Sequence, residues 1–135
     1  MKKSIILFVL FSFGTLLYAQ NSKYFCEIKG IEKEISSGLK IVFDFGSQPT
    51  YSMTGLKGKQ KLVDEKGKEI PFNSMVDAGN YLTQKGWTFL QAYSSSYGGN
   101  SIIHWIFYKE AASLEKAHEG IITKEDFDKK HGNED

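Results

Sequence analysis

The stretch FNSMVDAGNYLTQKGWTFLQAY, residues 72–93, decides the fold of this chain of 135 residues. Its first half predicts one helix, because Ser74 and Asp77 have the spacing of a capping box and apolar residues recur at helical intervals after them. Gly86 stands where a helix C-cap adopts a left-handed backbone conformation. The pattern therefore predicts a helix over 74–85.

Two strands rich in aromatic residues follow this helix. Residues 87–93 and 102–108 are each predicted to be extended, and the segment 94–101 between them contains Gly-Gly-Asn, which is typical of a turn. Both strands are apolar on both faces. A strand of that kind is expected in the middle of a sheet, so we predict that both lie centrally.

The residues before the helix predict further strands. Residues 23–29 and 39–45 alternate apolar with polar side chains, as half-buried strands do, and Cys26 falls on the apolar side. Residues 62–72 predict a hairpin around a glycine-containing turn, and residues 51–53 are a possible short edge strand. The predicted fold class is α+β: an antiparallel β-sheet of about four to six strands with one main helix packed on a face, and a short helical C-terminal tail.

The first nineteen residues predict a signal peptide. Lys2 and Lys3 form a positive n-region, residues 5–17 form an apolar run, and Ala19 is the small residue that a signal peptidase requires before its cut. An apolar run of this length is shorter than the roughly 20 residues that span a bilayer as a helix. We therefore expect a periplasmic or secreted protein that begins near Gln20, with no stable membrane anchor after cleavage.

The composition argues against several classes of function. The formal net charge is +1, and all 17 basic residues are lysine. Arginine is the side chain that grips phosphate and carboxylate groups with a planar fork, so its absence speaks against nucleic-acid readout and phosphoryl chemistry. Cys26 is the only cysteine, which excludes an intramolecular disulfide.

No motif in the chain predicts a metal or a cofactor. A zinc site needs three or four His, Cys or carboxylate ligands in close array, and the three histidines are scattered along the sequence. Neither a phosphate-binding P-loop nor a GxGxxG motif occurs. We therefore expect no catalytic, cofactor-binding or metal-binding residues, and a non-enzymatic protein.

The sequence favours an exported, non-enzymatic binding or interaction module for an exported protein or a glycan. Lysines at alternate positions and the aromatic hairpin supply the candidate contact residues, although a solvated edge and ordinary core packing explain the same patterns. The candidates are Lys57, Lys59, Lys61, Trp87, Tyr93, Tyr97, His104 and Trp105.

Two alternative functions stay open at this stage. In the first, the protein is a small hydrolase in which His104 activates one of the hairpin serines, Ser94, Ser95 or Ser96. That hypothesis requires a serine within about 3.5 Å of the imidazole, inside a pocket. In the second, the protein is an inhibitor or accessory subunit of another exported protein.

The last 26 residues, 110–135, form an acidic tail. Short helices are predicted over 112–118 and over 123–130, where Thr123 supplies an N-cap, and the residues after 130 are expected to be disordered. We treat residues 20–109 as the main domain.

Two parts of the chain resemble known families. The helix that ends in Gly-Trp, followed by an aromatic hairpin that closes on lysine, resembles a family of small secreted bacterial proteins of unknown function, and the resemblance implies a fold but no activity. The segment EGIITKEDFDKK is similar to the core of the SHOCT short C-terminal domain. The positions that carry the first resemblance are Asn73, Ser74, Asp77, Gly86, Trp87, Tyr93, His104, Trp105 and Lys109. Those that carry the second are Gly120, Ile121, Thr123, Asp126, Phe127 and Lys130.

Overall fold

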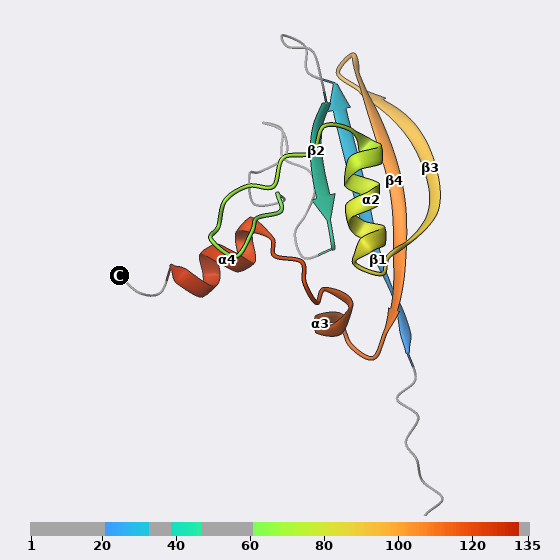
Figure 1. Ribbon diagram of the computed structural model, residues 1–135. Helices are drawn as coiled ribbons and strands as arrows, with labels where there is room; N and C mark the ends of the chain where they lie inside the picture. The colour runs from blue at the N-terminus through green and yellow to red at the C-terminus, as the bar shows by residue number, and fades with distance from the viewer. Residues whose placement is uncertain (1–20, 33–38, 47–60, 133–135) are drawn as a thin grey trace, which may run out of the picture.

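The computed structural model describes residues 21–32, 39–46 and 61–132, and they form one antiparallel sheet with three helices (Figure 1). The strands are β1 (Ser22–Glu32), β2 (Leu39–Asp44), β3 (Thr88–Tyr97) and β4 (Asn100–Ala111). The helices are α2 (Met75–Gln84), α3 (Leu114–Ala117) and α4 (Lys124–His131). The predicted α+β class, with an antiparallel sheet and a main helix on one of its faces, is confirmed at this level.

The order of the strands in the sheet is β2-β1-β4-β3. This order corrects one prediction: of the two aromatic strands, only β4 is central, and β3 is an outer strand. The prediction assumed that the apolar residues of β3 are buried, but several of them are exposed. Phe89, Leu90 and Tyr93 have 46%, 50% and 48% of their surface accessible to solvent.

Helix α2 begins and ends where the sequence predicts. The Ser74 hydroxyl accepts a hydrogen bond from the Asp77 amide at 3.1 Å, and the Asp77 carboxylate accepts one from the Asn73 amide at 3.0 Å. These contacts satisfy amides that the helix itself leaves without a partner. At the other end Gly86 has a φ of +83°, which glycine adopts without steric cost.

The core lies between α2 and the sheet. Ala78 and Leu82 of α2 are fully buried against it, and Gly79 brings the helix backbone close to the rings of Trp105 and Phe107. A Cβ atom at Gly79 would lie 3.1 Å from the Trp105 ring. The glycine therefore sets how closely the helix approaches β4.

The alternation of β1 sends its side chains to two different faces. Cys26 and Ile28 belong to the core under α2, as predicted, so Glu27 and Lys29 point to the opposite face of the sheet. The register pairs Ile28 with Trp105 and Lys29 with His104. His104 therefore shares the opposite face with the two charged residues of β1.

The C-terminal segment packs onto the same core. Ala117 and Ile121 are buried in it, and Thr123 pairs with Leu62 in an isolated bridge. Helix α3 is shorter than predicted, and α4 lies within one residue of its predicted bounds. The predicted hairpin over 62–72 forms around a turn at Gly67, but as a single bridge between Val63 and Glu69.

Some predictions fall outside the described residues. They are the signal peptide, the possible strand over 51–53, and the lysines Lys57 and Lys59. Within the described ranges, no helix combines the length and the apolar character needed to cross a membrane.

Candidate functional site: a polar network across the sheet

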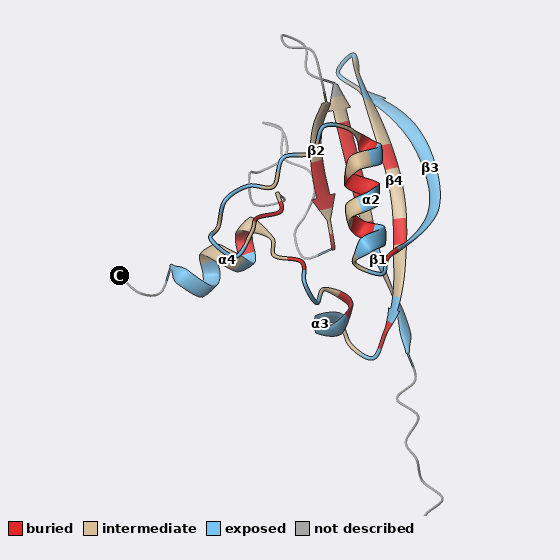
Figure 2. Ribbon diagram, viewed as in Figure 1, coloured by how far each residue is buried: buried red, intermediate tan, exposed pale blue. Residues whose placement is uncertain are grey.

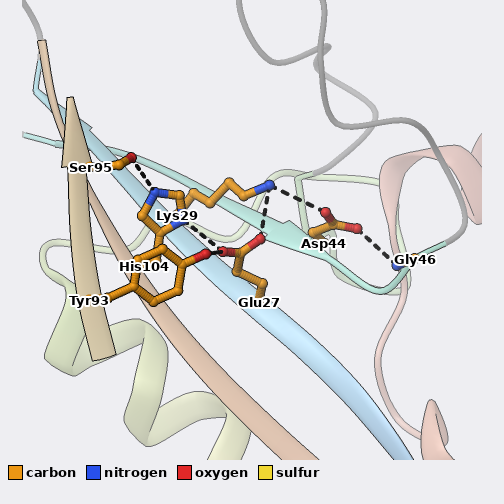
Figure 3. A network of polar contacts seen from close by, with 7 residues as sticks. All are labelled: Glu27, Lys29, Asp44, Gly46, Tyr93, Ser95 and His104. Carbon is orange, nitrogen blue, oxygen red and sulfur yellow. Dashed lines mark hydrogen bonds and ion pairs between the residues drawn. The ribbon is translucent and has the colours of Figure 1, made fainter. Parts of the chain in front are cut away.

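A network of polar side chains crosses the sheet face that is opposite to α2. Its members come from all four strands and meet at the carboxylate of Glu27 on β1 (Figure 3). The side chains in it are Glu27, Lys29, Asp44, Tyr93, Ser95 and His104.

Ser95, His104 and Glu27 are joined by a chain of two hydrogen bonds. The Ser95 hydroxyl oxygen lies 2.8 Å from Nε2 of His104. The other ring nitrogen, Nδ1, lies 2.7 Å from Oε1 of Glu27. The order is therefore hydroxyl, imidazole, carboxylate, with each side chain supplied by a different strand.

Tyr93 fixes the imidazole from a second direction. Tyr93 and His104 are paired residues of β3 and β4, and their rings stack with centroids 4.3 Å apart and planes 3° apart. The Tyr93 hydroxyl then reaches across β4 and donates to Oε1 of Glu27 at 2.9 Å. This contact ties the outer strand β3 to β1, two positions away in the sheet.

Lys29 extends the network to the opposite outer strand. Its ammonium group lies 2.9 Å from Oε2 of Glu27 and 3.3 Å from Oδ2 of Asp44 on β2. Asp44 in turn accepts a hydrogen bond from the Gly46 amide at 2.8 Å. Lys29 is buried despite its charge, and buried charges are stable only when paired in this way.

Glu27 is ionised at neutral pH. Burial raises the pKa of its carboxyl group, but hydrogen bonds from Lys29, His104 and Tyr93 outweigh that effect and lower the pKa below the ordinary value of 4.5. When His104 is neutral, an ionised carboxylate at Nδ1 favours the tautomer with its proton on that nitrogen. Nε2 is then an acceptor for the Ser95 hydroxyl.

The structure separates the aromatic candidates that the sequence grouped together. Trp87 is a core residue with 2% of its surface exposed, and Trp105 is half-buried between the rings of Phe89 and Phe107. Among the candidates of this group whose side chains the structure describes, Tyr93 and His104 join the network. Tyr97 ends β3, but its side chain is outside the described part of the molecule.

One lysine candidate can be placed relative to the network. Of the three, only Lys61 is among the described residues, and its ammonium group lies 2.6 Å from the Glu69 carboxylate. The lysine patch stays a prediction, because Lys57 and Lys59 lie outside the described residues.

Sequence reasoning missed Glu27, Lys29 and Asp44 as members of a site. The sequence shows that these charged residues alternate with apolar ones along the strands, but charged residues in that pattern usually face solvent. Only the register, which places Lys29 opposite His104 and Glu27 opposite Asp44, brings them together. The sequence offered one signal for this site. Glu27 and Lys29 lie on the polar side of one predicted strand, and His104 lies in another predicted strand.

The outer edge of β3 is the second distinctive feature. The strand is ten residues long, TFLQAYSSSY, and contains no charged residue, proline or glycine. Figure 2 shows most of it as exposed, whereas buried residues concentrate in β1, β2 and β4. The outer strand on the other side, β2, is six residues long and carries Lys40 and Asp44.

Comparisons with known proteins leave the family open. No family model, curated protein or solved structure matches the chain. The resemblances to a secreted family and to the SHOCT core therefore stay predictions.

Proposed function

We propose that this protein is an exported binding module that takes up an extended segment of another exported protein along the edge of β3. The observation that carries the proposal is the long, uncharged, exposed outer strand. The main-chain groups along such an edge pair readily with another strand, and proteins usually block them with lysine, proline or a short strand. β3 has no lysine or proline, is ten residues long, and its one irregularity in register is confined to Phe89–Gln91, which favours strand addition along the rest of its edge.

The polar network supports this function by holding the edge in place. Tyr93 and Ser95 point from β3 into the contacts with Glu27 and His104, so the strand is fixed before a partner arrives. A preformed edge avoids the entropy cost of ordering itself on binding. Phe89 and Tyr93 project to opposite faces and offer apolar contacts on both sides of an added strand.

Export is the part of the proposal that rests on the sequence alone. If residues 1–19 are removed by a signal peptidase, the protein isolated from the cell envelope begins at Gln20. Mass spectrometry of the intact protein measures this directly. A mass that includes residues 1–19 would contradict cleavage near Ala19.

The binding edge is tested with a photo-crosslinking amino acid placed at Leu90 and, as the matched control, at Val76. Both positions are exposed and apolar, but Val76 lies on α2. In the cell envelope, crosslinks to another protein are expected from position 90 alone. Equal crosslinking from the two positions, or none, would contradict the proposal, as would adducts only with a glycan or a second copy.

A charge placed on the edge sharpens the test. Ser94→Lys puts an ammonium group on β3 and is expected to reduce the crosslink from position 90 at least about tenfold, because a charged edge opposes strand pairing. Gln84→Lys makes the same charge change on α2 and is expected to leave the crosslink intact. If both lysine variants behave alike, the edge of β3 is not the contact surface.

A further inference from the structure

The polar network holds a nucleophile, a base and an orienting carboxylate in sequence. A hydroxyl becomes a competent nucleophile when an adjacent base accepts its proton and a third group orients that base. Ser95, His104 and Glu27 have these three relations, with contacts of 2.8 Å and 2.7 Å. Of the two requirements of the hydrolase hypothesis, the contact with the imidazole is present and Ser95 makes it, on an exposed strand.

From this geometry we infer that Ser95 is an activated nucleophile that takes an acyl group from carboxylic esters and passes it to water. Ser95 itself is exposed, whereas His104 has only 6% of its surface accessible. An ester in solvent can thus reach the hydroxyl, while the imidazole behind it is shielded. The stacked ring of Tyr93 keeps the imidazole in the orientation that points Nε2 at Ser95.

The reaction proceeds in two balanced steps. In the first, Oγ of Ser95 attacks the ester carbonyl carbon, and its proton moves to Nε2 of His104. The ester C–O bond then breaks, and the departing alkoxide takes that proton, which leaves an acyl group on Ser95. In the second step water attacks the acyl carbon, gives its proton to Nε2, and the proton returns to Oγ as the acid leaves.

The open edge of β3 offers a donor for the developing oxyanion. Main-chain N–H groups of successive residues in a strand point to alternate sides within the sheet plane, and no described strand pairs with the outer side of β3. The outward N–H groups near the nucleophile are therefore either that of Ser95 or those of Ser94 and Ser96. In both cases an outward main-chain donor lies within one residue of Ser95 along the strand, and stabilisation of the carbonyl oxygen is assigned to that donor.

Esters are the substrate class that this arrangement suits. Expulsion of an alkoxide or a phenoxide needs less protonation of the leaving group than expulsion of an amine. A single imidazole on an exposed strand can supply that protonation. Glu27 acts here as a positioning residue, since it touches His104 and not the ester.

The inference is tested with two probes: p-nitrophenyl acetate, whose hydrolysis releases a coloured product, and a fluorophosphonate, which labels activated serines covalently. Wild-type protein is expected to show saturable hydrolysis and a fluorophosphonate adduct on Ser95, located by peptide mass spectrometry. Ser95→Ala is expected to abolish the adduct and to lower the saturable rate at least about 100-fold, because it removes the nucleophile on which the base acts.

Ser22→Ala is the matched control, because Ser22 is an exposed serine at the start of β1 that pairs with Ala111 and takes no part in the network. This variant is expected to keep both the adduct and the rate. An adduct on another residue, or hydrolysis unchanged by Ser95→Ala, would overturn the inference. Ser95→Ala removes one of the contacts that hold β3 to the network, and Tyr93 keeps another, so the variant is expected to stay folded with a melting temperature a few degrees lower at most, which a thermal scan verifies.

Two further variants separate the base from its orienting group. His104→Asn is expected to slow fluorophosphonate labelling about as much as loss of Ser95 slows hydrolysis. Glu27→Gln is expected to lower the labelling rate constant at saturating probe while leaving the half-saturating concentration unchanged. Labelling of His104→Asn at the wild-type rate would overturn the role of the imidazole, and an effect of Glu27→Gln on half-saturation alone would overturn positioning.

Discussion

Trp87→Ala is expected to lower the free energy of unfolding by about 3–5 kcal/mol, the usual cost of truncating a large buried aromatic residue. Trp87 lies in the core where the chain turns from α2 into β3, and its ring contacts Phe45 edge-on with centroids 5.7 Å apart. A single domain has roughly 5–15 kcal/mol of stability in all. The variant should therefore unfold at a much lower urea concentration.

Urea unfolding followed by circular dichroism measures this loss. The control is Phe25→Ala, because Phe25 is an aromatic residue with 55% of its surface exposed on β1. Its removal is expected to cost less than about 1 kcal/mol, as surface substitutions usually do. Equal losses for the two variants would contradict the position of Trp87 in the core.

Glu27→Ala is expected to lower the free energy of unfolding by about 3 kcal/mol, because it removes one member of a largely buried ion pair and leaves charge behind. Lys29 loses one of its acidic partners, and the hydroxyl of Tyr93 and Nδ1 of His104 lose an acceptor. The matched control is Glu110→Ala on β4. Glu110 pairs with Lys23 at 3.8 Å, and more than half of each side chain is exposed.

Exposed ion pairs contribute at most about 1 kcal/mol, so the two alanine variants should differ clearly in their urea midpoints. Comparable losses would show that the Glu27 contacts contribute no more than a surface pair. The polar network would then not contribute to holding β3 in the sheet.

The contribution of Glu27 should also depend on pH. Burial raises its pKa, but the hydrogen bonds from Lys29, His104 and Tyr93 outweigh burial, so the folded-state pKa lies below the ordinary 4.5. A lowered folded-state pKa gives stability that is fully present above pH 4.5 and is lost as the pH falls through the folded-state value. Glu27→Gln mimics the protonated carboxyl group and removes this dependence.

The difference in unfolding free energy between wild type and Glu27→Gln is therefore expected to be largest at neutral pH and to shrink below pH 4.5. Urea unfolding at pH 7 and at pH 3 measures it, and the other carboxyl groups cancel in the difference. A difference that stays constant with pH would mean that the Glu27 carboxylate is not held in its ionised form by the network.

The local structure of this protein was largely predictable from its sequence. The helix over Met75–Gln84 was predicted from the Ser74 cap and from Gly86, because capping contacts act between residues a few positions apart. The burial of Cys26 and Ile28 followed from the period of two in a strand. These features depend on neighbours along the chain, which a sequence displays directly.

The order of the strands and the polar network could not be predicted in the same way. Apolar residues on both faces of β3 suggested a central strand. The sequence does not show whether an aromatic residue is buried or exposed, so it did not reveal that β3 is an outer strand. The hydrolase hypothesis requires a contact between His104 and a serine of the hairpin, but the sequence does not choose among Ser94, Ser95 and Ser96. Glu27 is 77 residues from His104 in the chain, and no local pattern links the two.

The sequence by itself determined where the helix begins and ends, which strands have an apolar side, and that Ser95 and His104 lie on neighbouring strands of one hairpin. Only the tertiary structure decided that β1 lies against β4, and with that pairing Glu27 came to meet His104. The physical reason is that strand register and sheet order are set by the packing of the whole core. A shift of β1 by one residue would turn Glu27 toward α2 and dismantle the network.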